Sequence, residues 1–205
     1  MSITLDKVTK QYNDVVLFQD VDYTFKSDTK YAIKGHNGSG KSTLLQIISS
    51  FLIPDKGTLT YRMGATALKP EEIYKHVSIA APFSALFLEM TLKEAIDFHF
   101  QFKELTHFTN THELIDFLQF STSQHKTLQN FSSGMLQKVK LALAVFSKTS
   151  ILLLDEPCMN FDEANKGWYI DLMHKYTNDR LVVIASNDPF ETSFCEHSIR
   201  ILDYK

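Results

Sequence analysis

The stretch GHNGSGKST, residues 35–43, constrains the fold of this chain more than any other feature. It fits the pattern G-x-x-x-x-G-K-[ST], a loop whose backbone N–H groups can surround a polyphosphate. Its glycines let the backbone approach a ligand because no Cβ intervenes. We expect a short apolar strand before the loop, at residues 31–33, and a helix after it, at residues 42–48. The dipole of that helix adds to the anion site, so the sequence predicts a nucleoside triphosphate site.

The side chains of this loop have expected roles in holding the ligand. Lys41 can reach the β- and γ-phosphates, and the Ser42 hydroxyl can be a ligand of Mg²⁺. The predicted nucleotide-binding residues are Gly35, His36, Asn37, Gly38, Ser39, Gly40, Lys41, Ser42 and Thr43.

Composition limits the class of protein. The 205 residues have room for one large domain or for one domain with an inserted lobe, and 44% hydrophobic residues is typical of a globular core. A formal net charge of −3 argues against a general nucleic-acid binder, so no nucleic-acid partner is expected. Cys158 and Cys195 provide neither a disulfide framework nor metal-ligand spacing, which favours a reducing compartment.

The sequence predicts neither a secretion signal nor a membrane helix. Residues 1–7 lack the apolar run of a signal peptide. No window approaches the ~20 apolar residues that a membrane helix needs. We therefore expect a soluble protein that meets a membrane only through a partner.

The first third of the chain is strand-rich apart from the helix after the loop. Strand-like runs cover residues 3–12, 15–25 and 30–34, and the short polar turns between them indicate an antiparallel start. Further strands are expected at residues 57–62 and 76–80.

A helical stretch is expected to follow, from Thr91 to about Leu118. Thr91 with Glu94 fits a capping box, and Asn110 with Glu113 fits a weaker one. We assign residues 83–131, approximately, to a helical lobe inserted into an α/β core.

The second half returns to alternating strands and helices. Residues 150–154 and 181–185 are continuous apolar runs, which is typical of parallel strands covered on both faces. The first run leads into Asp155 and Glu156, and the second into Asn187. Because ligands of open parallel sheets bind outside the carboxyl ends of the strands, we expect these residues to meet the phosphate loop.

The two acids have different expected roles. Asp155 is placed to hold Mg²⁺ through its water shell or through Ser42, as Walker-B aspartates do. Glu156 is expected on the other side of the strand, where it could accept a proton from a water that attacks the γ-phosphate. Asp155 and Ser42 are therefore the predicted metal ligands, and Glu156, Asn187 and Lys41 the predicted catalytic residues.

The segment FSSGM, residues 131–135, is followed by a helix-like run at residues 137–144. It resembles the signature loop of ATP-binding cassette (ABC) ATPases, usually written LSGGQ. Ser132 and Gly134 match that pattern, whereas Phe131, Ser133 and Met135 are variants. Taken alone, the segment also fits a routine helix N-cap. The resemblance implies that Ser132, Ser133, Gly134 and Met135 contact ATP bound to the other subunit of a head-to-tail dimer.

Further elements of the family can be placed on the chain. Tyr12 matches the aromatic residue that stacks on adenine, although a turn tyrosine packed on the sheet is the alternative. Residues 157–162 resemble the D-loop, in which Asp162 keeps its place. The implied fold is α/β: a P-loop NTPase core with a mostly parallel sheet, an N-terminal antiparallel β lobe and an inserted helical lobe. Residues 1–205 would form a single domain, with the β lobe at 1–30 and the core at 31–82 and 132–205.

Two departures from the family pattern bear on catalysis. The Q-loop glutamine position falls on Pro82, which has no carboxamide to touch Mg²⁺ and the attacking water. The switch histidine position falls on Asn187, which can donate a hydrogen bond but cannot become a cation near neutral pH. We expect hydrolysis to be slowed by roughly 10- to 100-fold.

The resemblance implies the ATP-binding and hydrolysing subunit of an ABC transporter, which binds ATP and Mg²⁺ and works as a homodimer or heterodimer of cassettes. Integral membrane subunits would hold it on the inner, cytoplasmic face of the cell membrane. Residues 82–90 are a candidate docking surface, with packing between lobes as the alternative. Two other functions remain open: a soluble ABC ATPase of an iron–sulfur assembly complex, and an ATP-dependent clamp without turnover.

Overall fold

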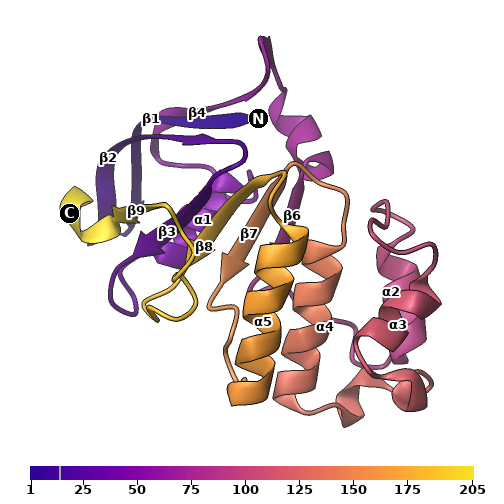
Figure 1. Cartoon of the computed structure of the whole chain (residues 1–205). Helices are drawn as coiled ribbons and strands as arrows, with labels where there is room; N and C mark the ends of the chain where they lie inside the picture. Colours follow the sequence, from indigo (N-terminus) through magenta and orange to yellow (C-terminus); the bar gives the residue numbers. More distant parts are fainter. Residues whose placement is uncertain (14) are drawn as a thin grey trace. The chain divides into compact units, whose positions relative to one another are not determined.

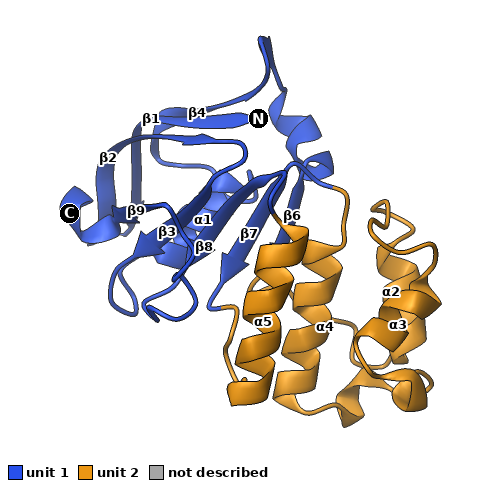
Figure 2. Cartoon of the chain, in the orientation of Figure 1, with its two compact units in different colours: residues 1–79, 149–156, 178–205 blue, residues 80–148, 157–177 orange. Residues whose placement is uncertain are grey.

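The computed structural model describes residues 1–13 and 15–205, and its contacts divide the chain into two units (Figures 1 and 2). Unit 1 comprises residues 1–79, 149–156 and 178–205, and unit 2 comprises residues 80–148 and 157–177. Unit 2 therefore includes residues 132–148 and 157–177, which we assigned to the core rather than to the helical lobe. The assignment of subdomains from the sequence stays a prediction.

An antiparallel sheet lies in unit 1 and has the strand order β2-β1-β4-β5. Its strands are β1 (Ser2–Tyr12), β2 (Val15–Lys26), β4 (Lys56–Met63) and β5 (Thr66–Ala67). The expected pairing of the first two strands is confirmed, with Ile3 opposite Phe25. β4 also pairs with β1, although we counted its residues with the core. Alternation of apolar residues locates a strand but does not tell which sheet it joins.

A second sheet has the order β6-β7-β8-β3-β9, and the pairs β7/β8, β8/β3 and β3/β9 are parallel. Its strands are β3 (Lys30–Lys34), β6 (Val77–Ala80), β7 (Ile151–Asp155), β8 (Leu181–Ala185) and β9 (His197–Arg200). Every residue of β7 and β8 is buried, as expected for strands covered on both faces. The third strand-like run of the N-terminal segment, β3, thus belongs to the parallel sheet and not to an antiparallel start.

The core of unit 1 surrounds helix α1 (Lys41–Ile48), which follows β3. Leu44, Leu45, Ile47 and Ile48 are buried in one cluster with side chains of both sheets. At the end of α1, the buried Tyr61 hydroxyl donates to the Ile48 carbonyl at 2.9 Å. This packing holds α1 in place, and α1 begins directly after the phosphate loop. Short 3-10 helices complete the unit at Pro70–Lys75 and Ile201–Tyr204.

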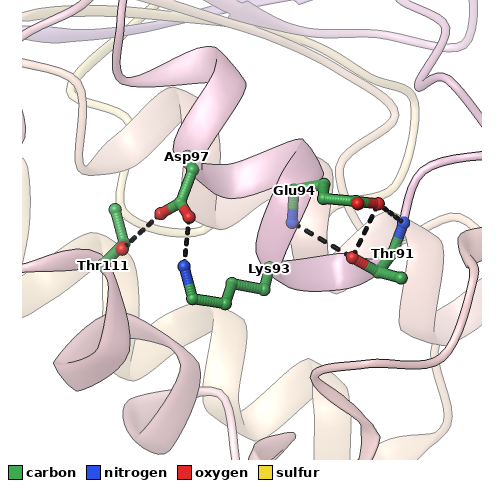
Figure 3. Close-up of polar contacts among 5 residues, drawn as sticks. All are labelled: Thr91, Lys93, Glu94, Asp97 and Thr111. Atoms are coloured by element: carbon green, nitrogen blue, oxygen red, sulfur yellow. Dashed lines mark hydrogen bonds and ion pairs between the residues drawn. The ribbon is translucent and has the colours of Figure 1, made fainter.

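Unit 2 is helical, with α4 and α5 side by side (Figure 1). Its α-helices are α2 (Leu92–His99), α3 (Thr111–Phe117), α4 (Ser133–Val145) and α5 (Glu163–Tyr176), and 3-10 turns occur at Ser121–Ser123 and Leu128–Asn130. The capping box predicted at the start of α2 is confirmed (Figure 3): the Thr91 N–H donates to Glu94 Oε2 at 2.8 Å, and the Glu94 N–H donates to Thr91 Oγ1 at 3.3 Å. Asp97 joins α2 to α3 by accepting from Lys93 and from Thr111.

The helical stretch expected from Thr91 to about Leu118 is interrupted between α2 and α3. The Thr106 N–H donates to the Phe146 carbonyl and the Lys148 N–H to the Glu104 carbonyl, both at 2.9 Å. Residues 104–106 thus pair with the chain beyond α4 instead of continuing the helix. Such long-range pairing leaves no helical periodicity in the sequence, so the break could not be predicted from it.

Candidate functional site

The phosphate loop connects β3 to α1 in unit 1. A Cβ on Gly35 would lie 2.5 Å from both Ser39 Oγ and Ile201 Cγ2, so any larger residue there would displace these side chains. Gly40, the N-cap of α1, has a φ of 106°, which also favours glycine. Because Gly40 carries no side chain, the first amides of α1 receive no side-chain cap and can donate to an anion. The loop therefore has the backbone geometry of a phosphate site.

Lys41 lies across the loop with its side chain buried. Its Nζ donates to the Gly35 carbonyl at 2.8 Å and to the His36 carbonyl at 3.3 Å. An ammonium has three hydrogens, so one donor remains for a phosphate oxygen. Lys41 borders a cavity of about 350 Å³, and the other residues lining it are Tyr12, Leu17, Asn37, Gly38, Gly40, Ser42, Thr43 and Glu156. Of these, Leu17 was missed from the sequence.

Asp155, the last residue of β7, has the environment of a metal ligand. The Ser42 hydroxyl, in the first turn of α1, favours the charged form of this carboxylate. Burial outweighs that effect and raises the pKa of Asp155, and the Glu156 charge raises it further. Among the described residues, nothing bonds to the buried Oδ1 atom of Asp155.

This unsatisfied carboxylate oxygen beside a hydroxyl fits Mg²⁺, which prefers oxygen ligands. The described residues contain no cluster of three or more His, Cys, Asp or Glu that could hold a metal alone. Mg²⁺ at such sites is usually bound by one or two protein ligands together with substrate phosphates. The donor set of Ser42 and Asp155 fits that arrangement.

The alternation of a strand predicts that Glu156 lies on the other side from Asp155, and this stays a prediction. Its φ is 46°, in the left-handed region, and it lines the same cavity as the phosphate loop. Its N–H donates to the Ala185 carbonyl at 2.9 Å, which holds this turn in place. A left-handed conformation costs a residue other than glycine about 1–3 kcal/mol, and such strain is concentrated at functional sites. The turn therefore brings Glu156 to the cavity of the phosphate loop, where its charge still acts on Asp155.

Asn187 follows β8 and contacts the phosphate loop directly. Its Oδ1 accepts from the Gly35 N–H at 3.1 Å. Because the oxygen is bound to the loop, the side-chain NH₂ group is left to donate to a ligand. The expected meeting of the phosphate loop, the two acids and Asn187 is thus present within unit 1.

Tyr12 ends β1 and lines the cavity with 49% of its surface exposed. Lys10 Nζ lies over its ring, 5.3 Å from the centroid. The position fits a stacking platform at the mouth of the phosphate site, and stacking on adenine stays a prediction.

The signature-like loop lies in unit 2 at the start of α4. Ser132 is the N-cap of this helix, and its hydroxyl accepts from the Met135 N–H at 3.2 Å. The residues Ser132, Ser133, Gly134 and Met135 line a cavity of about 300 Å³ together with Phe120, Lys138, Asn160, Asp162 and Asn165. Ser132 therefore acts as a helix N-cap, as the sequence alone also allows. Binding of phosphate from another subunit stays a prediction.

The D-loop-like segment packs on the same helix. A Cβ on Gly134 would lie 2.9 Å from the Asn160 carbonyl oxygen, so the two backbones approach closely. Gln137 Nε2 donates to the Pro157 carbonyl at 2.9 Å, and this bond is buried. Asp162 caps α5 by accepting from the Asn165 N–H at 2.8 Å. Gln137 was not singled out from the sequence, where an amide within an amphipathic helix gives no signal.

A comparison with protein families identifies the family of this chain. The family model described as "ABC transporter" matches residues 18–159, so the chain belongs to the ABC transporter family of ATP-binding proteins.

The relatives and the solved structures point the same way. The chain is 25% identical over 202 residues to YybJ of Bacillus subtilis, an uncharacterized ABC transporter ATP-binding protein, with 95% of this chain and 89% of YybJ covered. It is 25% identical to human ATP-binding cassette sub-family A member 2, with 98% of this chain covered but only 8% of that protein's length.

A solved structure from Pyrococcus furiosus, described as an ABC transporter (ATP-binding protein), is similar with a TM-score of 0.82 and 21% identity, and each chain is covered in full. At that identity the likeness shows the fold alone, and it confirms the predicted P-loop α/β architecture. None of the helices in the described residues combines the length and apolar character needed to cross a bilayer.

Proposed function

We propose that this chain is the ATP-binding and hydrolysing subunit of an ABC transporter, which closes as a dimer around two Mg-ATP and drives a membrane partner. The observation that carries the proposal is the meeting of four groups in one site: the phosphate loop, the Ser42–Asp155 pair, Glu156 and Asn187. In P-loop NTPases, catalysis is almost entirely positioning and electrostatic stabilisation, and these groups supply both.

Each group has a proposed role. The amides at the start of α1 and the third hydrogen of Lys41 hold the phosphates. Ser42 and Asp155 would hold Mg²⁺, which neutralises charge on the β- and γ-phosphate oxygens when bound. Glu156 accepts the proton of the attacking water, and the left-handed turn that aims it at the cavity supports this role.

Asn187 takes the place of a histidine, and this makes slow hydrolysis the expected behaviour. Its oxygen is held by the Gly35 N–H, and its NH₂ group can still donate to the γ-phosphate. It cannot carry a positive charge there, which removes part of the stabilisation of the transition state. Pro82 should slow hydrolysis further, because it offers no carboxamide to the metal or to the attacking water. A clamp that binds ATP without turnover is the second candidate, and Asn187 is the residue that favours it.

An apolar surface of unit 2 supports a membrane partner. Phe87 and Leu88 are 59% and 42% exposed. The Phe87 ring meets Phe98 at 5.7 Å between centroids, and Phe98 meets Phe102 at 5.2 Å. These rings border a groove of about 270 Å³. Exposed apolar surface of this kind is typical of protein–protein contact, and we assign it to a helix of the membrane subunit.

Dimerisation tests the proposal most simply. Glu156→Gln should bind Mg-ATP without consuming it and should then elute as a dimer, with its mass measured by light scattering. ADP in place of ATP, and Lys41→Ala with ATP, should leave a monomer. A Glu156→Gln protein that binds ATP and stays monomeric would contradict the homodimer.

Fractionation separates the transporter from a soluble assembly factor. The tagged chain should sediment with membranes from cells and should leave them when the membranes are dissolved in mild detergent. Recovery only in a soluble complex would favour the iron–sulfur assembly alternative.

A further inference from the structure

Lys10 is a buried lysine that the proposed mechanism does not use. It is 7% exposed and stands two positions before Tyr12 in β1. A lysine is almost never buried without a partner. Its Nζ lies 3.1 Å from Asp55 Oδ1 and donates to the Ile53 carbonyl at 3.3 Å. The ammonium is therefore fixed in position.

Asp55 ties this ammonium to the backbone of β1. Its second oxygen, Oδ2, accepts from the Gln11 N–H at 2.8 Å. Its own N–H donates to the Thr9 carbonyl at 2.9 Å. The Gln11 bond and the Lys10 bond lower the pKa of Asp55, so the carboxylate stays charged at neutral pH. The strand is thus held on both sides of Lys10.

The fixed ammonium faces the Tyr12 ring. The distance from Nζ to the ring centroid is 5.3 Å, within the range of a cation–π interaction. Tyr12 is half exposed at the end of a strand, where an aromatic side chain without such a contact can change rotamer freely. A cation held beside the ring restricts this freedom while part of the ring stays open toward the cavity.

We propose that Lys10, fixed by Asp55, is a positioning residue that holds the Tyr12 ring as a stacking platform for the nucleobase. The inference rests on the proposed function, because it takes the cavity to be an ATP site. Restricting the ring before the ligand arrives reduces the entropy lost on binding, which is the usual gain from preorganisation. Lys10 would therefore affect binding of the base and not binding of the phosphates.

The test compares two ligands on the full chain: Mg-ATP and Mg-tripolyphosphate, which fills the phosphate loop but has no base. Lys10→Met keeps most of the side chain and removes the charge. It should weaken ATP binding about fivefold, as expected for loss of one cation–π contact, and leave tripolyphosphate binding unchanged. Lys10→Arg, which keeps a cation, should bind ATP nearly as the wild type does.

Two further variants make the result decisive. Asp55→Asn removes the ion pair while keeping Lys10, and it should weaken ATP binding in the same selective way. Adding Lys10→Met to Tyr12→Ala should have no further effect, because the ring it positions is gone. Equal weakening of both ligands, or an unchanged affinity for ATP, would overturn the inference. Failure of the wild type itself to bind ATP would instead overturn the proposed function.

Discussion

The folded chain without a ligand disfavours the charged form of Asp155. Burial is the largest cause of its raised pKa, and its Oδ1 has no hydrogen-bond partner among the described residues. A carboxylate in this state is an expected feature of a cation site, since the cation would supply the missing interaction. We propose that the stability lost at this residue is recovered when Mg-ATP binds.

A pH-dependent stability test follows from this. The pKa of Asp155 is higher in the folded chain than in the unfolded chain, so the folded state binds more protons between the two values, and the stability linked to this group falls as pH rises. Asp155→Asn should therefore raise the Tm of the ligand-free protein at pH 7.5, by about 2–4 °C for each kcal/mol relieved in a chain of this size.

The Tm difference between Asp155→Asn and the wild type should shrink as the pH approaches the unfolded value near 4. The variant should also lose the rise in Tm that Mg-ATP gives the wild type. A lower Tm for the variant at pH 7.5 would show that the carboxylate is already stabilised without a cation.

Helix α4 and the segment after β7 pack on each other. The proposed contact of residues 132–135 with ATP on the other subunit depends on this packing. Gly134 on α4 allows close approach of the Asn160 carbonyl, and Gln137 binds the Pro157 carbonyl one residue after Glu156. The start of α4 and the chain that follows Glu156 are thus held together within unit 2. Because protein interiors are closely packed, we expect a single added methyl group at this contact to destabilise the fold.

Gly134→Ala tests this contact, and Gly167→Ala is its matched control. The added Cβ at 134 would lie 2.9 Å from a backbone oxygen, so we expect a loss of about 1–3 kcal/mol in the free energy of unfolding. At 167, within α5, no heavy atom lies within 4 Å of an added Cβ, and alanine should stabilise the helix by about 0.5–1 kcal/mol. Urea unfolding measures both. Equal effects of the two substitutions would contradict the packing described for Gly134.

Much of the element structure could be predicted because its signals are local. The loop motif, the apolar runs of β7 and β8 and the capping box at Thr91 each depend on residues close in sequence. The left-handed turn at Glu156 could not be predicted, because it is held by a bond to Ala185 on the neighbouring strand. The bond from Gly35 to Asn187 spans 152 positions, and only the general rule that parallel strands end together anticipated it.

At the scale of the whole molecule, the chain belongs to a family of ATP-binding proteins, and the exposed aromatic groove of unit 2 is our candidate for its contact with a membrane subunit. Changing Phe87 and Leu88 to serine should abolish co-purification with that subunit and leave ATP binding intact, because neither residue lines the phosphate site. Met63→Ser, at an exposed apolar residue of β4, is the control. Co-purification that survives the double change would show that this surface does not contact the membrane subunit.

The proposed active site is best tested by steady-state Mg-ATP turnover of the purified chain, with Glu156→Gln as the blank and Asn187→His beside it. We expect turnover above the blank in the wild type and an increase of roughly tenfold or more in Asn187→His, since a charged donor would be restored. Turnover equal to the blank, with ATP still bound, would contradict hydrolysis at this site. It would favour the alternative function, a clamp that binds ATP without turnover. Fast turnover that Asn187→His does not change would contradict the role given to Asn187.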